Sequence, residues 1–124
     1  MALDTVRVVD TDFDLLTKLK RTTGIRNWNV LCRWAFCMSL ADPSPPVVDP
    51  IGSLSSIEMT WKVFSGTHSS VYWSLLTQRC QDDGISLHAD RLEREFYRHL
   101  HRGIGLLSNI AQRPSLRDLF DLAS

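Results

Sequence analysis

The sequence predicts a mainly α-helical fold that opens with one short strand, and three observations support this fold class. Residues 5–10 are short, β-branched and followed by acidic residues, which is typical of a strand. Long segments after residue 12 place apolar residues at helical spacing. The 124 residues contain 44% apolar and 23% charged side chains, values that allow a core and exclude wholesale disorder. We therefore expect residues 1–124 to form a single domain.

The first helix is expected directly after the strand. Either Thr11 or Asp12 can cap its N-terminus, and Gly24 suits the position just past its C-terminus. The apolar residues expected to face inward are Phe13, Leu15, Leu16 and Leu19.

The second helix begins after a cap at Asn27 or Asn29 and runs to about Ala41. It is apolar nearly all round, and Arg33 is its only charged residue. Such a helix in a small domain must be covered on several sides. Because the chain itself offers limited cover, this helix predicts self-association.

The second half of the chain begins with a proline-rich linker at 42–50, which ends the second helix. The elements expected after it are a half-buried strand at 57–64, helices at about 67–82 and 88–102, and a short C-terminal helix with a capping box at Ser115 and Asp118. The segment Gly103-Ile104-Gly105 interrupts or ends the helix before it, or allows close approach of another helix.

Charge is segregated along the chain although the net charge is zero. Fourteen basic and fourteen acidic side chains exclude a globally basic nucleic-acid binder. Residues 18–33 nevertheless contain five cations and no acid, namely Lys18, Lys20, Arg21, Arg26 and Arg33. A local cluster of this kind is typical of phosphate contact, and a solvated helix face is the alternative.

A second basic block lies near the C-terminus. Helical spacing places four of its arginines close to one stripe: Arg91, Arg94, Arg98 and Arg102. Glu95 is spaced to pair with Arg91 and with Arg98 on the same helix, so part of this stripe is expected to be neutralised.

Motifs of catalysis and metal binding are missing from the sequence. It contains no Cys-x-x-Cys or His-x-x-x-His pair, and His99 and His101 diverge on a helix. The segment 103–105 is too short for a nucleotide-binding loop, and no serine sits in a nucleophile elbow. We expect no catalytic residue, no metal and no cofactor.

The cysteine count and the length of the apolar runs indicate in which cellular compartment the protein is expected. The chain has an odd number of cysteines, namely Cys32, Cys37 and Cys80. We expect them to be reduced, buried thiols of a cytoplasmic protein. No apolar run is long enough to cross a membrane. Among the four tryptophans, Trp28 beside Arg26 is the candidate for nucleotide contact, and the others are expected to be core or interface anchors.

Two separated segments resemble the DndE family, whose members are small subunits of the bacterial DNA phosphorothioation (DNA sulfur modification) system. The first comprises residues 19–25, Leu-Lys-Arg-Thr-Thr-Gly-Ile, and residues 29–40, Asn-Val-Leu-Cys-Arg-Trp-Ala-Phe-Cys-Met-Ser-Leu. The second is His-Leu-His-Arg-Gly-Ile-Gly-Leu-Leu at residues 99–107. The resemblance covers most of the chain in the same order and with similar spacing. One departure is Arg26-Asn27-Trp28, where many relatives have Thr-Pro.

The resemblance implies a mostly helical protein whose opening strand–helix–helix unit is similar to ribbon-helix-helix DNA binders. It also implies tetramers that bind duplex DNA, notably nicked duplex, beside the cysteine desulfurase, the sulfur-transfer subunit and an SMC-like ATPase. The family's basic first helix corresponds to Lys18, Lys20 and Arg21, while Arg33 and Arg102 lie within its motifs. The chain has only three lysines, so arginine is expected to share the lysines' role.

We thus expect a non-catalytic subunit that binds double-stranded DNA as a homo-oligomer, without contact with a membrane. The residues expected to contact DNA are Lys18, Lys20, Arg21, Arg26, Arg33 and Arg102. One alternative is a ribbon-helix-helix transcriptional regulator, in which Arg7 would face the major groove. Another is a protein-interaction subunit that docks on the sulfur-transfer or ATPase partner through Trp61 and Trp73. A nickase has been proposed for such proteins, but the residues offer no constellation that would cut a phosphodiester.

Overall fold

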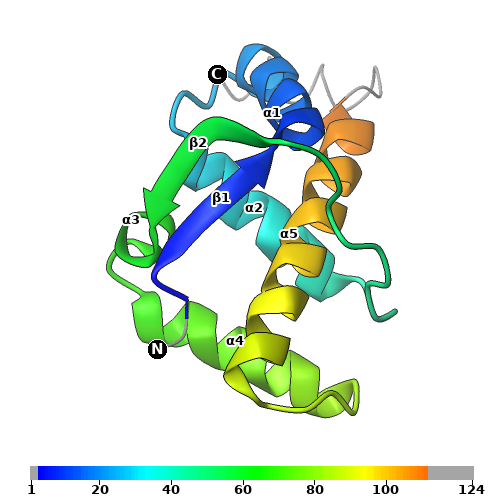
Figure 1. Cartoon of the computed structure of the whole chain (residues 1–124). Helices are drawn as coiled ribbons and strands as arrows, with labels where there is room; N and C mark the ends of the chain where they lie inside the picture. Colours follow the sequence, from blue (N-terminus) through cyan, green and yellow to red (C-terminus); the bar gives the residue numbers. More distant parts are fainter. Residues whose placement is uncertain (1–2, 112–124) are drawn as a thin grey trace.

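The structure, a computed structural model, describes residues 3–111, in which five helices surround a common core beside a two-stranded sheet (Figure 1). The elements in chain order are β1 (Thr5–Val9), α1 (Asp10–Thr23), α2 (Trp28–Ala41), β2 (Leu54–Thr60), α3 (Trp61–Ser65), α4 (Ser69–Asp82) and α5 (Ala89–Ala111). The mainly helical fold class with an opening strand is therefore confirmed. The predicted C-terminal helix at Ser115 lies outside the described residues. None of the helices in the described part is both long and apolar enough to span a bilayer.

The sheet joins β1 to β2 in antiparallel register, with Val6 opposite Met59 and Arg7 opposite Glu58. The predicted second strand at 57–64 is wrong at both ends, because β2 begins at Leu54 and stops at Thr60. The Thr60 hydroxyl accepts a hydrogen bond from the Val63 backbone N–H at 3.1 Å and thereby caps α3. The apolar and polar residues that alternate after Thr60 therefore form a short helix rather than a continuation of the strand.

Helix α5 is continuous through the two glycines at which the sequence predicted an interruption or an end. Gly103 is buried, and a Cβ atom there would overlap the backbone carbonyl of Ala35 on α2. The glycine therefore serves close packing of α5 on α2, which was the other role considered for it. Gly105 has nothing within 4 Å of a Cβ built on it.

An aromatic cluster fills the space between α2, α3 and α5. The ring centroids of Phe36 and Phe96 lie 5.2 Å apart, and those of Phe64 and Phe96 also lie 5.2 Å apart. Trp61 packs edge-on against Trp73 at 5.7 Å. These contacts place both tryptophans at the core of the monomer, where Trp61 is buried.

Helix α2 is covered on one side by its own chain. Leu31, Ala35 and Phe36 are fully buried, whereas Trp34 is 52% exposed and Cys37 is also exposed. The expectation of three buried thiols is therefore wrong for Cys37, because this residue lies on the uncovered side of α2. Self-association through that side stays a prediction.

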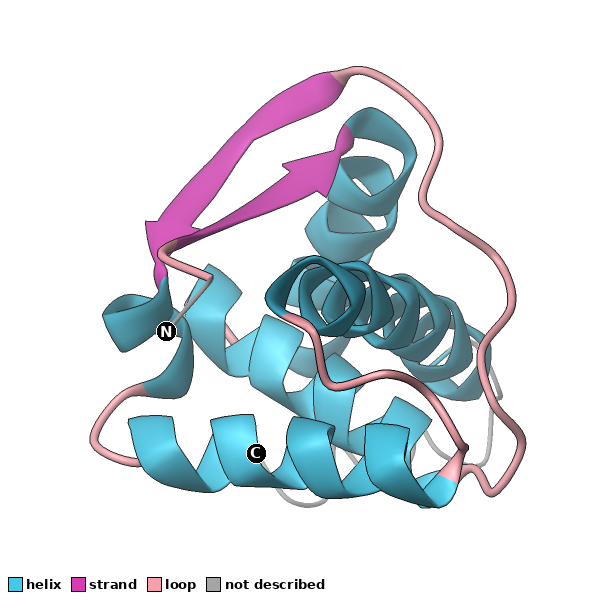
Figure 2. Ribbon diagram, turned by 60° about the horizontal axis from the view of Figure 1, so that its bottom comes forward, coloured by secondary structure: helices cyan, strands magenta, loops and turns pink. Residues whose placement is uncertain are grey.

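The segment between α2 and β2, here called the strap (residues 42–53), runs outside the helices (Figures 1 and 2). At its start, the Ser44 carbonyl accepts hydrogen bonds from Arg102 at 2.6 Å and from Arg79 at 2.7 Å. At its end, the Asp10 backbone N–H donates to the Ser53 carbonyl at 2.8 Å. The linker is thus anchored at both ends rather than free.

Candidate nucleic-acid interface

The basic end of α1 is formed where the helix stops at Gly24. Gly24 adopts the left-handed conformation (φ 76°), and its N–H donates to the Lys20 carbonyl at 3.1 Å. Lys20 and Arg21 therefore lie in the last turn. Cations at this end also stabilise the helix, since its dipole is negative there.

The three cations of α1 separate into two groups. Lys18 and Arg21 are exposed and three residues apart, so they share a helix face. Lys20 lies about 160° around the helix from Lys18, and its Nζ is 4.0 Å from the centroid of the Trp28 ring, a cation–π contact. The structure therefore does not gather Lys18, Lys20 and Arg21 on a single face.

Trp28 links the end of α1 to the turn that leads into α2. Its ring packs on Phe13, with centroids 6.0 Å apart, and receives Lys20 on its face. Arg26 is exposed, and both it and Trp28 line a shallow groove of about 280 Å³ with Asn29 and the β2 residue Glu58. Lys20, Trp28 and Arg26 are thus brought together, and this is the strongest juxtaposition among the predicted contact residues.

The other two candidates lie elsewhere. Arg33 on α2 lines a separate groove with Trp34 and Tyr72, and a Cβ at Gly66 would meet its guanidinium. Arg102 lines a different cavity beside the strap.

Arg102 is committed to contacts within the fold. Its Nε donates to the Ser39 hydroxyl at 2.8 Å, its Nη2 to the Ser39 carbonyl at 2.8 Å, and its Nη1 to the Ser44 carbonyl at 2.6 Å. The side chain thereby holds the strap to α2. Burial lowers the pKa of Arg102, as expected for a guanidinium withdrawn from water.

The arginine stripe on α5 is largely paired. The predicted pairs within the helix are confirmed, at 3.4 Å from Arg91 to Glu95 and 3.3 Å from Arg98 to Glu95. Asp49 of the strap adds pairs with Arg94 at 2.9 Å and with Arg98 at 2.8 Å. Sequence reasoning missed this acceptor because it lies 45 residues or more from its partners, where helical spacing carries no information.

The five cations of residues 18–33 differ from the arginines of α5 in that they form no ion pair with a described residue. Among residues 3–111, the ion pairs engage Arg7, Arg79, Arg91, Arg94, Arg98, His101 and Arg102. Within that range, no carboxylate lies within 4.0 Å of Lys18, Lys20, Arg21, Arg26 or Arg33. The field of these five cations is therefore not cancelled by a direct contact with a described residue.

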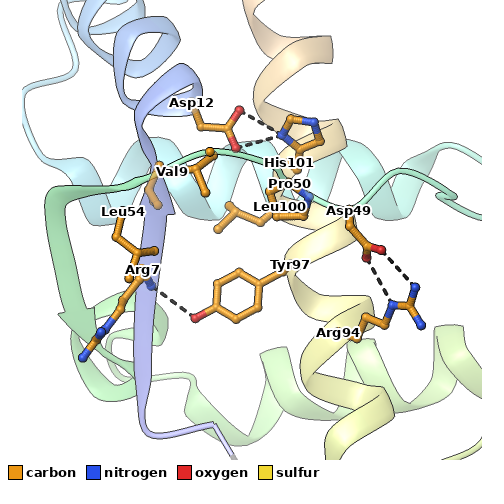
Figure 3. Close-up of a pocket in the computed structure, with 12 residues that line it drawn as sticks. Arg7, Val9, Asp12, Asp49, Pro50, Leu54, Arg94, Tyr97, Leu100 and His101 are labelled. Carbon is orange, nitrogen blue, oxygen red and sulfur yellow. Dashed lines mark hydrogen bonds and ion pairs between the residues drawn. The ribbon is translucent and has the colours of Figure 1, made fainter.

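A cavity of about 440 Å³ lies between β1, the strap and α5 (Figure 3). At its edge, His101 Nδ1 lies 2.8 Å from Asp12 Oδ2, and this carboxylate raises the pKa of His101. The Arg7 backbone N–H donates to the Tyr97 hydroxyl at 3.2 Å, and that hydroxyl donates to the Thr5 carbonyl at 3.1 Å. These contacts therefore fasten β1 and α1 to α5.

No three histidine, cysteine, aspartate or glutamate side chains in the described range gather where they could hold a metal ion. Cys32 and Cys80 are unsuited to a reactive role, because burial raises the pKa of Cys32 to about 12 and that of Cys80 to about 11.

Fold and site together define a class of small, mainly helical proteins in which one strand leads into two helices and a basic turn joins them. Comparison with known families identifies the particular family within this class. The model of the family described as DNA sulphur modification protein DndE matches residues 5–115. The chain belongs to the DndE family, which confirms the resemblance seen in its motifs, and it takes part in DNA sulfur modification as a small accessory subunit of the phosphorothioation system. No curated protein matches the chain.

Proposed function

We propose that this chain is a non-catalytic subunit of the phosphorothioation system, in the cytoplasm, that binds duplex DNA through phosphate contacts. The observation that carries the proposal is the group of Lys20, Trp28 and Arg26. Lys20 lies over the Trp28 ring there, Arg26 lines the same groove as that ring, and no described carboxylate forms an ion pair with either cation. Lys18 and Arg21 extend the charge along the exposed side of α1. Cations so placed contact backbone phosphates without reading sequence.

The proposal includes assembly into a homo-oligomer, a tetramer by analogy with the family. The chain has no net charge, so binding a polyanion depends on where its cations converge. The uncovered side of α2 carries a groove of about 410 Å³ lined by Trp34, Cys37, Met38 and Tyr72. Contact between copies along this groove would cover exposed apolar surface and would repeat the basic turn around one assembly.

The test is a fluorescence anisotropy titration of intact and nicked duplexes over a range of salt concentrations. We expect log K to fall with log salt by about 0.9 for each phosphate neutralised, with little dependence on sequence. The triple variant Lys18→Ala, Lys20→Ala, Arg21→Ala should bind at least about tenfold more weakly at low salt. Lys62→Ala, which replaces the third lysine of the chain, on α3, is the matched control and should bind like the unmodified protein. An affinity that stays flat with salt contradicts the proposal.

A second candidate is a protein-interaction subunit that docks on the sulfur-transfer or ATPase partners. The exposed apolar side chains of Val71 and Leu75 on α4 favour it. Co-purification with a partner, together with failure to bind any duplex, would support this role.

The regulator alternative finds less support. It requires Arg7 to face a DNA groove, whereas Arg7 pairs with Glu58 at 3.2 Å across the sheet of its own chain. Binding to one operator and not to random duplex would favour it nonetheless.

A further inference from the structure

We propose that Arg94 and Arg98 on α5 form a second phosphate-binding site, which the carboxylate of Asp49 occupies in the free protein. The Asp49 carboxylate would then act as an internal competitor that turns away when a phosphate group arrives, while the strap stays anchored. The assignment of that phosphate to the backbone of duplex DNA rests on the proposed function. The site itself is defined by the geometry of the two arginines.

Each of the two arginines donates hydrogen bonds from two nitrogens to the same carboxylate. Arg94 donates from Nε to Asp49 Oδ1 at 3.2 Å and from Nη2 to Oδ2 at 2.9 Å. Arg98 donates from Nε to Oδ1 at 2.8 Å and from Nη2 to Oδ2 at 3.4 Å. These hydrogen bonds hold the pKa of the Asp49 carboxyl well below its usual range. The fork of a guanidinium fits carboxylate and phosphate alike, so two forks converging on one anion suit a phosphate group.

The site is open to solvent on one side and fixed on the other. The side chains of Asp49 and Arg94 are 43% and 49% exposed, whereas Arg98 is only 13% exposed. Figure 3 shows Asp49 and Arg94 facing each other beside the cavity. Arg98 is also held by Glu95, at 3.3 Å, so its guanidinium keeps its position without Asp49. An incoming phosphate can therefore approach the half-exposed guanidinium of Arg94 beside the guanidinium of Arg98, which Glu95 also holds.

Asp49 can leave without detaching the strap. The start of the strap is tied to Arg79 and Arg102 through Ser44, and its end is tied to Asp10 through Ser53. Between these anchors, Pro46 is buried, whereas Val47, Val48 and Ile51 are 76%, 57% and 81% exposed, so the strap packs on the core mainly before Asp49. Turning the Asp49 side chain away from the arginines, with the strap left in place, breaks only the ion pairs that a phosphate would replace.

The deciding variant is Asp49→Asn, which removes the competing charge and keeps the size of the side chain. We expect its affinity for duplex DNA to rise about five- to tenfold at about 0.1 M salt, and the salt slope to steepen by about 0.9, the value for one added phosphate. The gain should disappear when Arg94→Ala or Arg98→Ala is added. Asp82→Asn, on α4, makes the same change in net charge at an exposed side chain that accepts a hydrogen bond from Gln78. Equal gains in both single variants, or no gain in folded Asp49→Asn, would overturn the proposal.

A second measurement does not depend on DNA or on the fold of the variant. Inorganic phosphate added to the unmodified protein at constant ionic strength should shift the Nε–H resonances of Arg94 and Arg98. It should leave unchanged that of Arg79, whose Nε donates to Asp83 Oδ2 at 3.0 Å. If these resonances shift while no duplex binds, the phosphate site is established and the proposed DNA-binding function fails. If they do not shift at any phosphate concentration, the site is refuted even where duplex DNA binds.

Discussion

Asp12 in the first turn of α1 and His101 near the middle of α5 form a carboxylate–imidazole pair, with 2.8 Å between Asp12 Oδ2 and His101 Nδ1. Asp12 is almost fully buried, and His101 is less than one-third exposed. The pair crosses 89 residues of sequence and fastens the basic helix to the long helix of the core. Its strength depends on the proton that His101 carries, so it links the stability of the fold to pH.

Replacing His101 should cost more stability in mild acid than in base. The Asp12 contact raises the pKa of His101 above its ordinary 6.5, so the folded state binds the proton more tightly than the unfolded state. The stabilisation is fully present below about pH 6.5 and is lost as pH rises through the raised value. His101→Gln should lower the free energy of unfolding by about 1–3 kcal/mol at about pH 6, and by less at about pH 9. Urea denaturation at both values checks this; equal losses would contradict it.

His99 should behave in the opposite way. It is fully buried, with Nδ1 2.8 Å from the Ser39 hydroxyl, and burial lowers its pKa to about 4. Between pH 6.5 and about 4 the unfolded state binds more protons than the folded one, so His99 lowers stability as pH falls through that window. The ring-proton resonances of His99 should titrate near pH 4 and those of His101 above 6.5. A midpoint near 6.5 for both histidines would show that neither contact acts as described.

Local sequence signals predicted the elements, and long-range contacts decided what those signals left open. The strand predicted at 5–10, the stop at Gly24 and the pairing of Glu95 with Arg91 depend on neighbouring residues. The structure confirms the stop and the pairing, and it confirms the strand except at Asp10, which begins α1. The role of Gly103 depends instead on the close approach of α5 to Ala35, a contact between distant segments that local signals do not reveal.

The same distinction applies to the candidate site. The spacing of basic residues identified Lys20 and Arg26, but the aromatic ring that joins them depends on how α1 and α2 meet. Arg102 belonged to a family motif, and its contacts with the strap could not be read from that motif. Helical spacing could not predict the pairing of Arg94 with Asp49 either, because Asp49 lies outside the helix.

The two glycines of α5 should respond to substitution in opposite directions. Gly103→Ala places a Cβ on the Ala35 carbonyl and should destabilise the protein by about 1–3 kcal/mol, because the helices must move apart. Gly105→Ala meets no atom within 4 Å and should stabilise by about 0.5–1 kcal/mol, since alanine favours the helix. Urea unfolding of both variants measures the difference. A stabilising Gly103→Ala would mean that α5 does not pack on α2 at this point.

Arg102→Lys separates a role in holding the fold from a role in binding DNA. The guanidinium joins Ser39 to Ser44 through three donors, a geometry that one ammonium cannot reproduce. The variant should therefore lose about 1–3 kcal/mol of stability while its affinity for duplex DNA stays unchanged. Arg26→Lys is the matched control: the side chain is exposed and, among residues 3–111, pairs with no carboxylate, so stability should change by less than about 0.5 kcal/mol. Urea unfolding and anisotropy titration of both variants measure the two quantities. If Arg102→Lys instead weakens DNA binding and leaves stability intact, Arg102 contacts phosphate as the family motif implied, and the strap is held by its other anchors.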